Sequence, residues 1–470
     1  MPGIQLGTAT GPAKLKAVTE LVNKLTKDLD KASLLPKDRD EALEELKIYG
    51  RDPRNADPIF TKDGISMLLR HGFNSSSGDT NRAALRVLAN SMLLKPETRR
   101  MLVDQGFAIK ACEGLKTGNW DNEFLTSRIL LLSTYGTKEH LVNLILEHDL
   151  AENITENLSR HAKLAATKPL QPEPMEDMAL AEILKLLFNV THFCKDQASR
   201  FSSAVPHIVE LFWKQDIPTS KPLEPPFGPL VNALINLDLS TAANQAAIFP
   251  SSESNKVAAR LISLLDSAMA NYGDNDLDVT VTPLISTMLK VHENAPSSVR
   301  QYISGKLLPT AEDRKSVLGK GKTLPSRLLK NSTNPMAPAF RDAVSHLLFQ
   351  LSDKDASKFV ENVGYGFASG FLFQNNVPIP ANASTTFNAG DSAGSQRLVN
   401  PITGQFLDQE RPSEMPPMSE EEQLREAERL FVLFERLRQN GIIDVENPVA
   451  QAVREGRFRD LGDDEVEELD

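Results

Sequence analysis

Hydrophobic and polar residues alternate with helical spacing along most of the chain. From residue 13 to about residue 372, apolar positions recur three and four residues apart, and short breaks rich in Pro, Gly, Asn and Asp separate the segments. Alternating patterns typical of β-strands are nearly absent. The pattern therefore predicts an all-α protein built from many amphipathic helices.

A polar residue recurs near the end of successive Leu-rich segments. When segments such as NRAALRVLANSMLL and AEILKLLFNVTHF are aligned, the shared polar position falls on Asn90, Ser133, Asn189, Asn236, Lys290 and Gln350. Neighbouring positions are 43 to 60 residues apart. Armadillo and HEAT units span about 40–47 residues, and the longer intervals here contain loop-like insertions. We predict an armadillo/HEAT-like helical-repeat superhelix over residues 1–374.

The last helix of each unit in such a stack lines a concave groove. Arg86 and Asn90 lie four residues apart beside an apolar stripe, and the same spacing relates Lys185 to Asn189 and Asn232 to Asn236. Asn side chains carry both a donor and an acceptor, so a row of them can hold a peptide backbone. We predict that these residues face the groove. In the alternative interpretation, each Asn caps a local break or bonds a neighbouring loop.

The composition changes after residue 374. Residues 375–418 are polar and rich in small side chains, which predicts a flexible linker. Residues 419–457 are predicted to form a C-terminal helical segment that opens with a capping box at Ser419 and Glu422, and residues 458–470 are predicted to form an acidic tail. The apolar face of the helix includes Leu424, Ala427, Leu430, Phe431 and Phe434. This face must be buried either on the chain's own repeats or on a partner.

Composition argues against several classes of function. The 470 residues carry a net charge of −11, so nucleic acid and anionic membranes are poor partners. No apolar run reaches about eighteen residues and no signal peptide is evident, so we expect a cytoplasmic protein that does not insert into membranes. The only cysteines, Cys112 and Cys194, form no CxxC motif, which argues against a zinc site or a disulfide scaffold.

Motifs for catalysis are also missing. The sequence GKGKT at residues 319–323 looks like the end of a phosphate loop, but Ser316 stands where that motif needs its first Gly. The eight histidines form no HExxH pattern. We therefore expect a binding protein without a cofactor, a metal or an active site of its own.

Several segments resemble one family, in the same order. Residues 343–374, AVSHLLFQLSDKDASKFVENVGYGFASGFLFQ, are similar to a segment of the synembryn family that ends a helix with LLF-x-L and continues into a Gly-Tyr-Gly turn, here Gly364–Gly366. NPITG at 400–404 is similar to the family's Asn-Pro-Val-Thr-Gly element, and MSEEEQLREAERLFVLFERLRQNGII to its C-terminal helix. Upstream, AEILKLLFNVTHF, VNALINL and LTSRILLL also resemble family segments, so the resemblance covers about residues 80–457.

Synembryns are chaperones and guanine-nucleotide exchange factors for heterotrimeric G-protein α subunits (Gα). The resemblance implies a groove that takes the C-terminal helix of GDP-bound, nucleotide-free or nascent Gα, so that GDP leaves. It also implies that the helix at 419–440 packs on the Gα nucleotide-binding domain. We expect a fungal-type, monomeric member that Gα can recruit to the plasma membrane. The groove residues carried over by position are Arg86, Asn90, Arg128, Lys185, Asn189, Asn232 and Asn236.

Two questions stay open at this point. Animal members carry a phosphorylated acidic run before the Asn-Pro element, whereas the linker here is nearly uncharged, and Ser419, which precedes three Glu residues, is an alternative phosphorylation site. The alternative function is an armadillo-type adaptor that holds a peptide segment without affecting nucleotide exchange. An enzyme of an unrecognised type is the third hypothesis.

Overall fold

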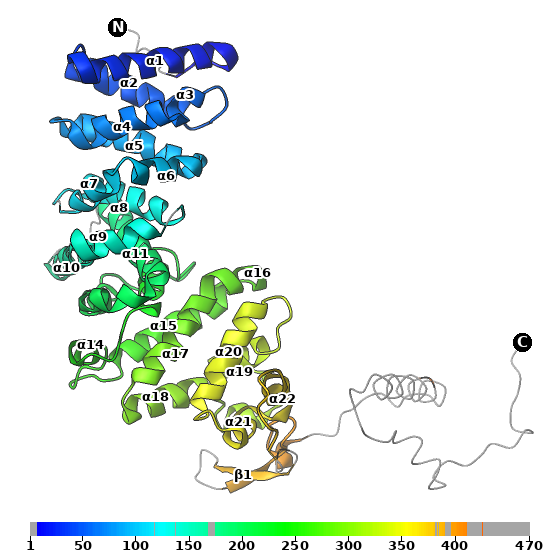
Figure 1. Cartoon of the computed structure of the whole chain (residues 1–470). Coiled ribbons are helices and arrows are strands. Elements are labelled where there is room, and N and C mark those ends of the chain that lie inside the picture. Colours follow the sequence, from blue (N-terminus) through cyan, green and yellow to red (C-terminus); the bar gives the residue numbers. More distant parts are fainter. Residues whose placement is uncertain are drawn as a thin grey trace, which may run out of the picture. The chain divides into compact units, whose positions relative to one another are not determined.

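The computed structural model describes residues 7–116, 118–136, 138–167, 174–380, 383, 385–390, 396–410 and 425. The chain divides into two compact units, Met1–Gln409 and Glu410–Asp470. All the helices and strands named below lie in the first unit, whose helices follow one another in a stack (Figure 1).

The first unit is built almost entirely of helices, which confirms the predicted all-α, helical-repeat fold. The described helices are α1 (Gly11–Lys31), α2 (Pro36–Tyr49), α3 (Asp57–Phe60), α4 (Lys62–Asn74), α5 (Gly78–Leu94), α6 (Glu97–Asp104), α7 (Phe107–Glu113), α8 (Trp120–Thr134), α9 (Glu139–Glu147), α10 (Leu150–Thr167), α11 (Pro174–Phe193), η1 (Lys195–Ala204), α12 (Val205–Leu211), α13 (Phe227–Ile235), α14 (Ala242–Ile248), α15 (Lys256–Asn271), α16 (Asp274–Asp276), η2 (Leu277–Val281), α17 (Thr282–Asn294), α18 (Ser297–Leu307), η3 (Asp313–Lys315), α19 (Leu324–Asn331), α20 (Pro338–Leu351), α21 (Ala356–Val363), α22 (Tyr365–Gln374) and η4 (Leu407–Gln409).

Six of these helices, α5, α8, α11, α13, α17 and α20, form one continuous row. Each packs on the next: α5 on α8, α8 on α11, α11 on α13, α13 on α17, and α17 on α20. Shorter or outlying helices lie between successive members in the chain, as α6 and α7 do before α8, and α9 and α10 before α11. These six row helices are the Leu-rich segments that the sequence alignment placed in register.

Local sequence explains where the row helices begin. The Ser77 hydroxyl accepts a hydrogen bond from the Thr80 amide at the start of α5, and the Asn119 side chain accepts one from the Asn122 amide at the start of α8. These caps satisfy amide groups that have no partner inside the helix. α17 and α20 instead carry a Pro in their first turn, where a missing N–H costs nothing.

A single apolar core runs through the unit. It extends from Val18 in α1 to Ala383 beyond α22, and the row helices contribute Leu, Ile, Val and Ala side chains to it. Burying each Leu, Ile or Val side chain contributes about 1.5–3 kcal/mol. The stack is therefore held together mainly by contacts between neighbouring helices, as in other repeat proteins.

The segment that follows α22 is structured where it is described, unlike the linker predicted for residues 375–418. Strands β1 (Phe387–Gly390) and β2 (Gln396–Val399) form an antiparallel hairpin, and the Phe406 amide donates to the Arg314 carbonyl over 2.9 Å. Small, polar residues suggested a solvated chain, but backbone groups of residues 401–406 pair with Arg314, Leu318, Tyr365 and Gly366. The compact unit accordingly extends to Gln409.

Two motifs that carried the family resemblance meet in this region. The Tyr365 amide donates to the Pro401 carbonyl over 2.7 Å, and the Gly366 amide donates to Ile402 over 3.2 Å. Gly364 has φ of +83°, and a Cβ there would lie 3.2 Å from the Ile402 carbonyl oxygen, so only Gly fits this turn. The Gly-Tyr-Gly turn therefore holds the NPITG segment against the repeat helices through backbone hydrogen bonds.

Arg314 joins these elements from within. Its guanidinium donates to the carbonyls of Gly404, Glu361 and Asn362 over 2.7 to 3.1 Å. The latter two carbonyls lie near the end of α21, where the helix dipole favours a cation. Burial of this side chain lowers the pKa of Arg314 to about 10.

Candidate partner-binding face

The row helices share a narrow strip of side chains that are not buried. From Ala83 to Met92, α5 buries every residue except Arg86 and Asn90, and from Leu125 to Thr134, α8 buries every residue except Arg128. The same pattern continues on the other row helices. The strip, called the accessible stripe below, consists of Arg86, Asn90, Arg128, Lys185, Phe188, Asn232, Ser286, Leu289, Lys290, His346 and Phe349.

The stripe is only one or two residues wide on each helix. On α11, every residue from Ala179 to Thr191 is buried except Lys185 and Phe188, and on α13, Asn232 alone interrupts the buried run from Pro229 to Leu234. Because each row helix packs on the next, these gaps lie along one face of the stack. We infer a continuous surface on which a partner can contact several repeats at once.

Five of the seven predicted groove residues belong to this stripe: Arg86, Asn90, Arg128, Lys185 and Asn232. Asn189 differs, because its side chain is buried and its Nδ2 donates to the Thr134 hydroxyl over 2.8 Å. Asn236 is half-buried just after α13, and its Nδ2 is shared between the Phe188 carbonyl at 3.3 Å and the Thr191 hydroxyl at 3.4 Å. The amide nitrogens of these two residues thus bond neighbouring helices within the chain, whereas the alternative interpretation expected a local break or a neighbouring loop.

The later repeats contain the same kind of bond. Lys290 Nζ donates to the Ile235 carbonyl over 2.8 Å, and Gln350 Nε2 donates to the Leu289 carbonyl over 3.0 Å. Together with Asn189 and Asn236, these residues form a ladder in which each row helix bonds the preceding one. The four aligned polar residues from α11 to α20 therefore fix the register between repeats. Lys290 belongs to both the ladder and the stripe.

Ion pairs link neighbouring helices along the amino-terminal half of the stripe. Arg86 lies 2.9 Å from the Asp121 carboxylate, which joins α5 to α8. Arg128 and Lys185 flank Glu182 at 3.4 and 2.9 Å, and the Arg128 guanidinium lies 5.5 Å from the centre of a nearby aromatic ring, that of Phe124. All three cations remain partly exposed, so each keeps donors directed away from its intramolecular partner.

A hollow of about 750 Å³ lies at the carboxyl-terminal end of the stripe. It is bounded by α17, α20, α22 and the residues that follow α22. The lining residues are Ser286, Leu289, Lys290, Glu293, His346, Phe349, Gln350, Lys354, Phe371, Asn375 and Val377. Ser286 and His346 precede Lys290 and Gln350 by four residues, the spacing that also separates Arg86 from Asn90. Ser286 and His346 were not among the predicted groove residues, although this spacing is visible in the sequence.

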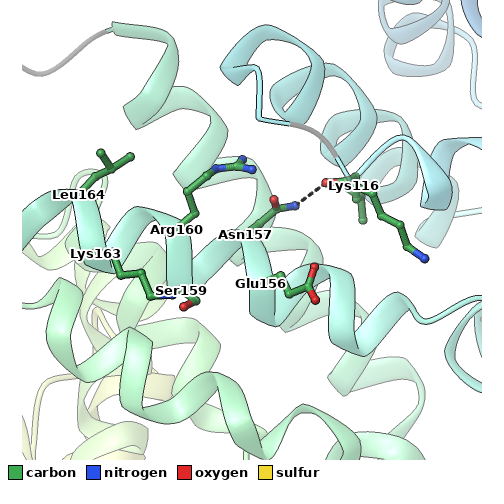
Figure 2. Close-up of a pocket in the computed structure, with 8 residues that line it drawn as sticks. Lys116, Glu156, Asn157, Ser159, Arg160, Lys163 and Leu164 are labelled. Atoms are coloured by element: carbon green, nitrogen blue, oxygen red, sulfur yellow. Dashed lines mark hydrogen bonds between the residues drawn. The ribbon is translucent and has the colours of Figure 1, made fainter.

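A second hollow, of about 690 Å³, lies beside α10 (Figure 2). Figure 2 shows Glu156, Arg160 and Lys163 on α10 beside it, and Asn157 Nδ2 donating to the Leu115 carbonyl over 3.1 Å. Lys116 Nζ lies 3.2 Å from the Asp149 carboxylate, and Arg160 pairs with the buried Glu123. Lys116 and Arg160 at this hollow are thus paired within the chain, and the accessible stripe is preferred as the candidate because it spans six packed helices.

The described residues offer little for metal or thiol chemistry. Among them, no three His, Cys, Asp or Glu side chains are grouped so that they could hold a metal ion. Cys112 and Cys194 are buried, and burial raises the pKa of Cys112 to about 11, which disfavours the reactive thiolate. In the same part of the chain, no helix is both long and apolar enough to cross a bilayer.

The predicted C-terminal contact residues lie outside the described residues. They are Leu424, Ala427, Leu430, Phe431 and Phe434, together with the possible phosphorylation site Ser419. Their role stays a prediction.

Known proteins with similar sequences cover most of this chain. The Synembryn-like chaperone C3E7.04c of Schizosaccharomyces pombe is 29% identical over 302 residues, which are 60% of this chain and 55% of that protein. Chaperone Ric-8A of Xenopus tropicalis is 23% identical over 473 residues, 91% of this chain and 86% of the relative. The chain thus spans about half of the fission yeast protein and most of the frog one.

Solved structures give a weaker likeness. The crystal structure of an engineered protein matches 58% of this chain and 97% of its own, with 17% identity and a TM-score of 0.41.

The family model described as guanine nucleotide exchange factor synembryn matches residues 42–457. These residues include the row helices, the Gly-Tyr-Gly turn and NPITG, so the resemblance seen in the sequence is confirmed and the chain belongs to the synembryn family.

Proposed function

We propose that this protein is a guanine-nucleotide exchange factor and folding chaperone for heterotrimeric Gα subunits, and that its accessible stripe holds the Gα C-terminal helix. Membership of a family described as an exchange factor, with relatives named as chaperones, supports the general role. The observation that supports the binding mode is the stripe itself, which continues across six packed helices.

The stripe suits a helical segment that ends in a carboxylate. Arg86, Arg128 and Lys185 offer charge-assisted hydrogen bonds, which are about twice as strong as neutral ones. Asn90 and Asn232 can donate to carbonyls and accept from amides at the end of a bound helix, where backbone groups lack partners. No side-chain hydrogen bond to another described residue is found for either Asn, so their amides need no rearrangement before they bind.

Nucleotide release follows from holding this helix. A Gα subunit whose C-terminal helix is bound elsewhere loses a support of its guanine-binding loops, so GDP dissociates and the open client stays bound until GTP restores the pocket. The predicted helix at 419–440 contributes a second contact on the nucleotide-binding domain of Gα. In this mechanism the protein acts by binding and needs no nucleotide site of its own.

A nucleotide-release assay tests the proposal. Purified Gα loaded with a fluorescent GDP analogue is mixed with the full-length protein and an excess of GTP, and the fluorescence decay gives the release rate. We expect faster release, and a smaller acceleration with Lys185→Ala. If several Gα classes show no acceleration while their C-terminal peptides still bind, the protein is an armadillo-type adaptor instead.

A further inference from the structure

The hollow at the carboxyl-terminal end of the stripe differs chemically from the rest of the stripe. Between Arg86 and Asn232, the stripe is polar apart from Phe188. At the hollow, Leu289, Phe349, Phe371 and Val377 supply apolar surface. This end is therefore suited to a different part of the partner than the polar end.

Aromatic rings form one wall of the hollow. The rings of Phe349, Phe359 and Phe371 pack mutually with centroids 5.1 to 5.6 Å apart, and the His346 ring meets Phe371 edge-on at 4.9 Å. Such packing holds the rings rigidly, so little conformational entropy is lost when an apolar group binds against them. Phe349 and His346 also belong to the stripe, which makes the hollow continuous with the proposed binding surface.

The rim of the hollow carries cations. Lys354 Nζ lies 3.6 Å from the Glu293 carboxylate, and the two side chains remain 62% and 51% exposed. Exposed pairs of this kind contribute little to stability, so a carboxylate from a partner can replace Glu293 at small cost. Lys290 adds a second cation, whose ammonium group is already held by the Ile235 carbonyl.

We propose that this hollow is a second anchor for the client, taking a bulky apolar side chain of the bound Gα segment while a neighbouring carboxylate of that segment pairs with Lys354. The apolar wall, the cationic rim and the continuity with the stripe together specify this chemistry. The inference rests on the proposed function and extends it by naming the side chains that the client must present.

Filling the hollow tests the apolar contact. Ser286→Phe places a ring in the hollow, and Ser298→Phe on the exposed side of α18 is the matched control. The probe is a fluorescent synthetic peptide of the Gα C-terminal helix, with binding to the full-length protein read by anisotropy and folding checked by a thermal melt. We expect binding at least about tenfold weaker with Ser286→Phe and within about twofold of wild type with the control, since hot-spot contacts cost this much.

A double-mutant cycle tests the ionic contact and does not depend on Ser286→Phe folding. Lys354→Met and wild type are titrated with peptides in which each carboxylate is neutralised in turn, and Lys330→Met, exposed on α19, is the control. We expect one carboxylate to couple with Lys354 by about threefold or more. If no carboxylate couples, or if both Phe variants bind like wild type, the second anchor is overturned while the proposed function stands. If the wild-type protein binds no Gα peptide, the proposed function itself fails.

Discussion

Two sets of polar side chains on the same row helices differ in what they bind. Asn189 and Gln350 are buried and donate to the preceding helix, whereas Lys185 and His346, four residues earlier on the same helices, are exposed. Positions four apart on an α-helix differ by only about 40° in direction. Because these helices are buried on almost every side, this 40° difference around the helix axis is enough to distinguish a side chain that joins repeats from one that a partner can reach.

A recurring Asn in a helical repeat can therefore have either of two roles. A ladder Asn compensates for its own burial by a bond to the preceding repeat, because a buried amide without a partner costs about 1–3 kcal/mol. A stripe Asn keeps its amide available to a partner. The chain contains two of each, which allows them to be compared by the same substitution.

Removing the two ladder amides should have the largest effect on stability. Asn189→Ala with Asn236→Ala deletes two bonds between row helices, and we expect the free energy of unfolding to fall by about 2–4 kcal/mol, measured by urea denaturation. Binding of the Gα peptide, measured at a temperature where the variant is folded, should change little. Unaltered stability together with lost binding would show that these amides face the partner after all.

Removing the two stripe amides is the matched experiment. Asn90→Ala with Asn232→Ala changes the same atoms at accessible positions, and we expect Gα peptide binding to weaken about tenfold, or about 1.4 kcal/mol, while unfolding changes by less than about 0.5 kcal/mol. Anisotropy and urea denaturation give the two values. A loss of stability equal to that of the ladder variant would remove the distinction between the two sets.

Deleting residues 419–470 separates the stripe from the predicted C-terminal helix. If the stripe alone holds the Gα C-terminal helix, peptide binding should stay within about twofold of wild type. GDP release should slow about fivefold, about 1 kcal/mol, because the second contact on Gα is lost. Release at the full rate from the truncated protein would exclude the docking role of Phe431 and Phe434.

A pH-dependent effect is expected at His140, which lies on α9. His140 Nε2 lies 3.1 Å from the Ser133 hydroxyl, and burial lowers the pKa of His140 from 6.5 to about 4. The unfolded chain therefore binds a proton below pH 6.5 that the folded chain takes up only near pH 4, so stability should decline as the pH falls through this window. His140→Gln should flatten this part of the curve in urea denaturation. If the free energy of unfolding of this variant depends on pH as steeply as that of wild type, groups other than His140 cause the dependence.

Much of the architecture follows from the sequence. The spacing of Leu residues predicted helices in repeat units, and alignment on one polar residue per unit identified the helices that pack as a row. Arg86, Asn90, Arg128, Lys185 and Asn232 are not buried, as a position facing the groove requires, and their role in binding stays a prediction. These results depend on local periodicity, which a sequence records directly.

Other features depend on contacts between distant segments. Asn189 can be buried because the Thr134 hydroxyl, 55 residues earlier in the chain, accepts a hydrogen bond from its amide. The periodicity of residues along α11 does not identify that partner. Residues 396–409 looked like a linker because the Arg314 guanidinium that bonds Gly404 lies 90 residues away. The hollow likewise exists only through the relative placement of α17, α20 and α22.

Site-specific photo-crosslinking tests most directly whether the stripe holds the Gα C-terminal helix. A photoreactive amino acid is placed at Asn232 on the stripe or at Ser298 on α18, the protein is mixed with nucleotide-free Gα, and the products are mapped by mass spectrometry. We predict that Asn232 crosslinks to the last helix of Gα and that Ser298 does not. Equal crosslinking from both positions, or crosslinks from Asn232 that map only to other parts of Gα, would contradict the account.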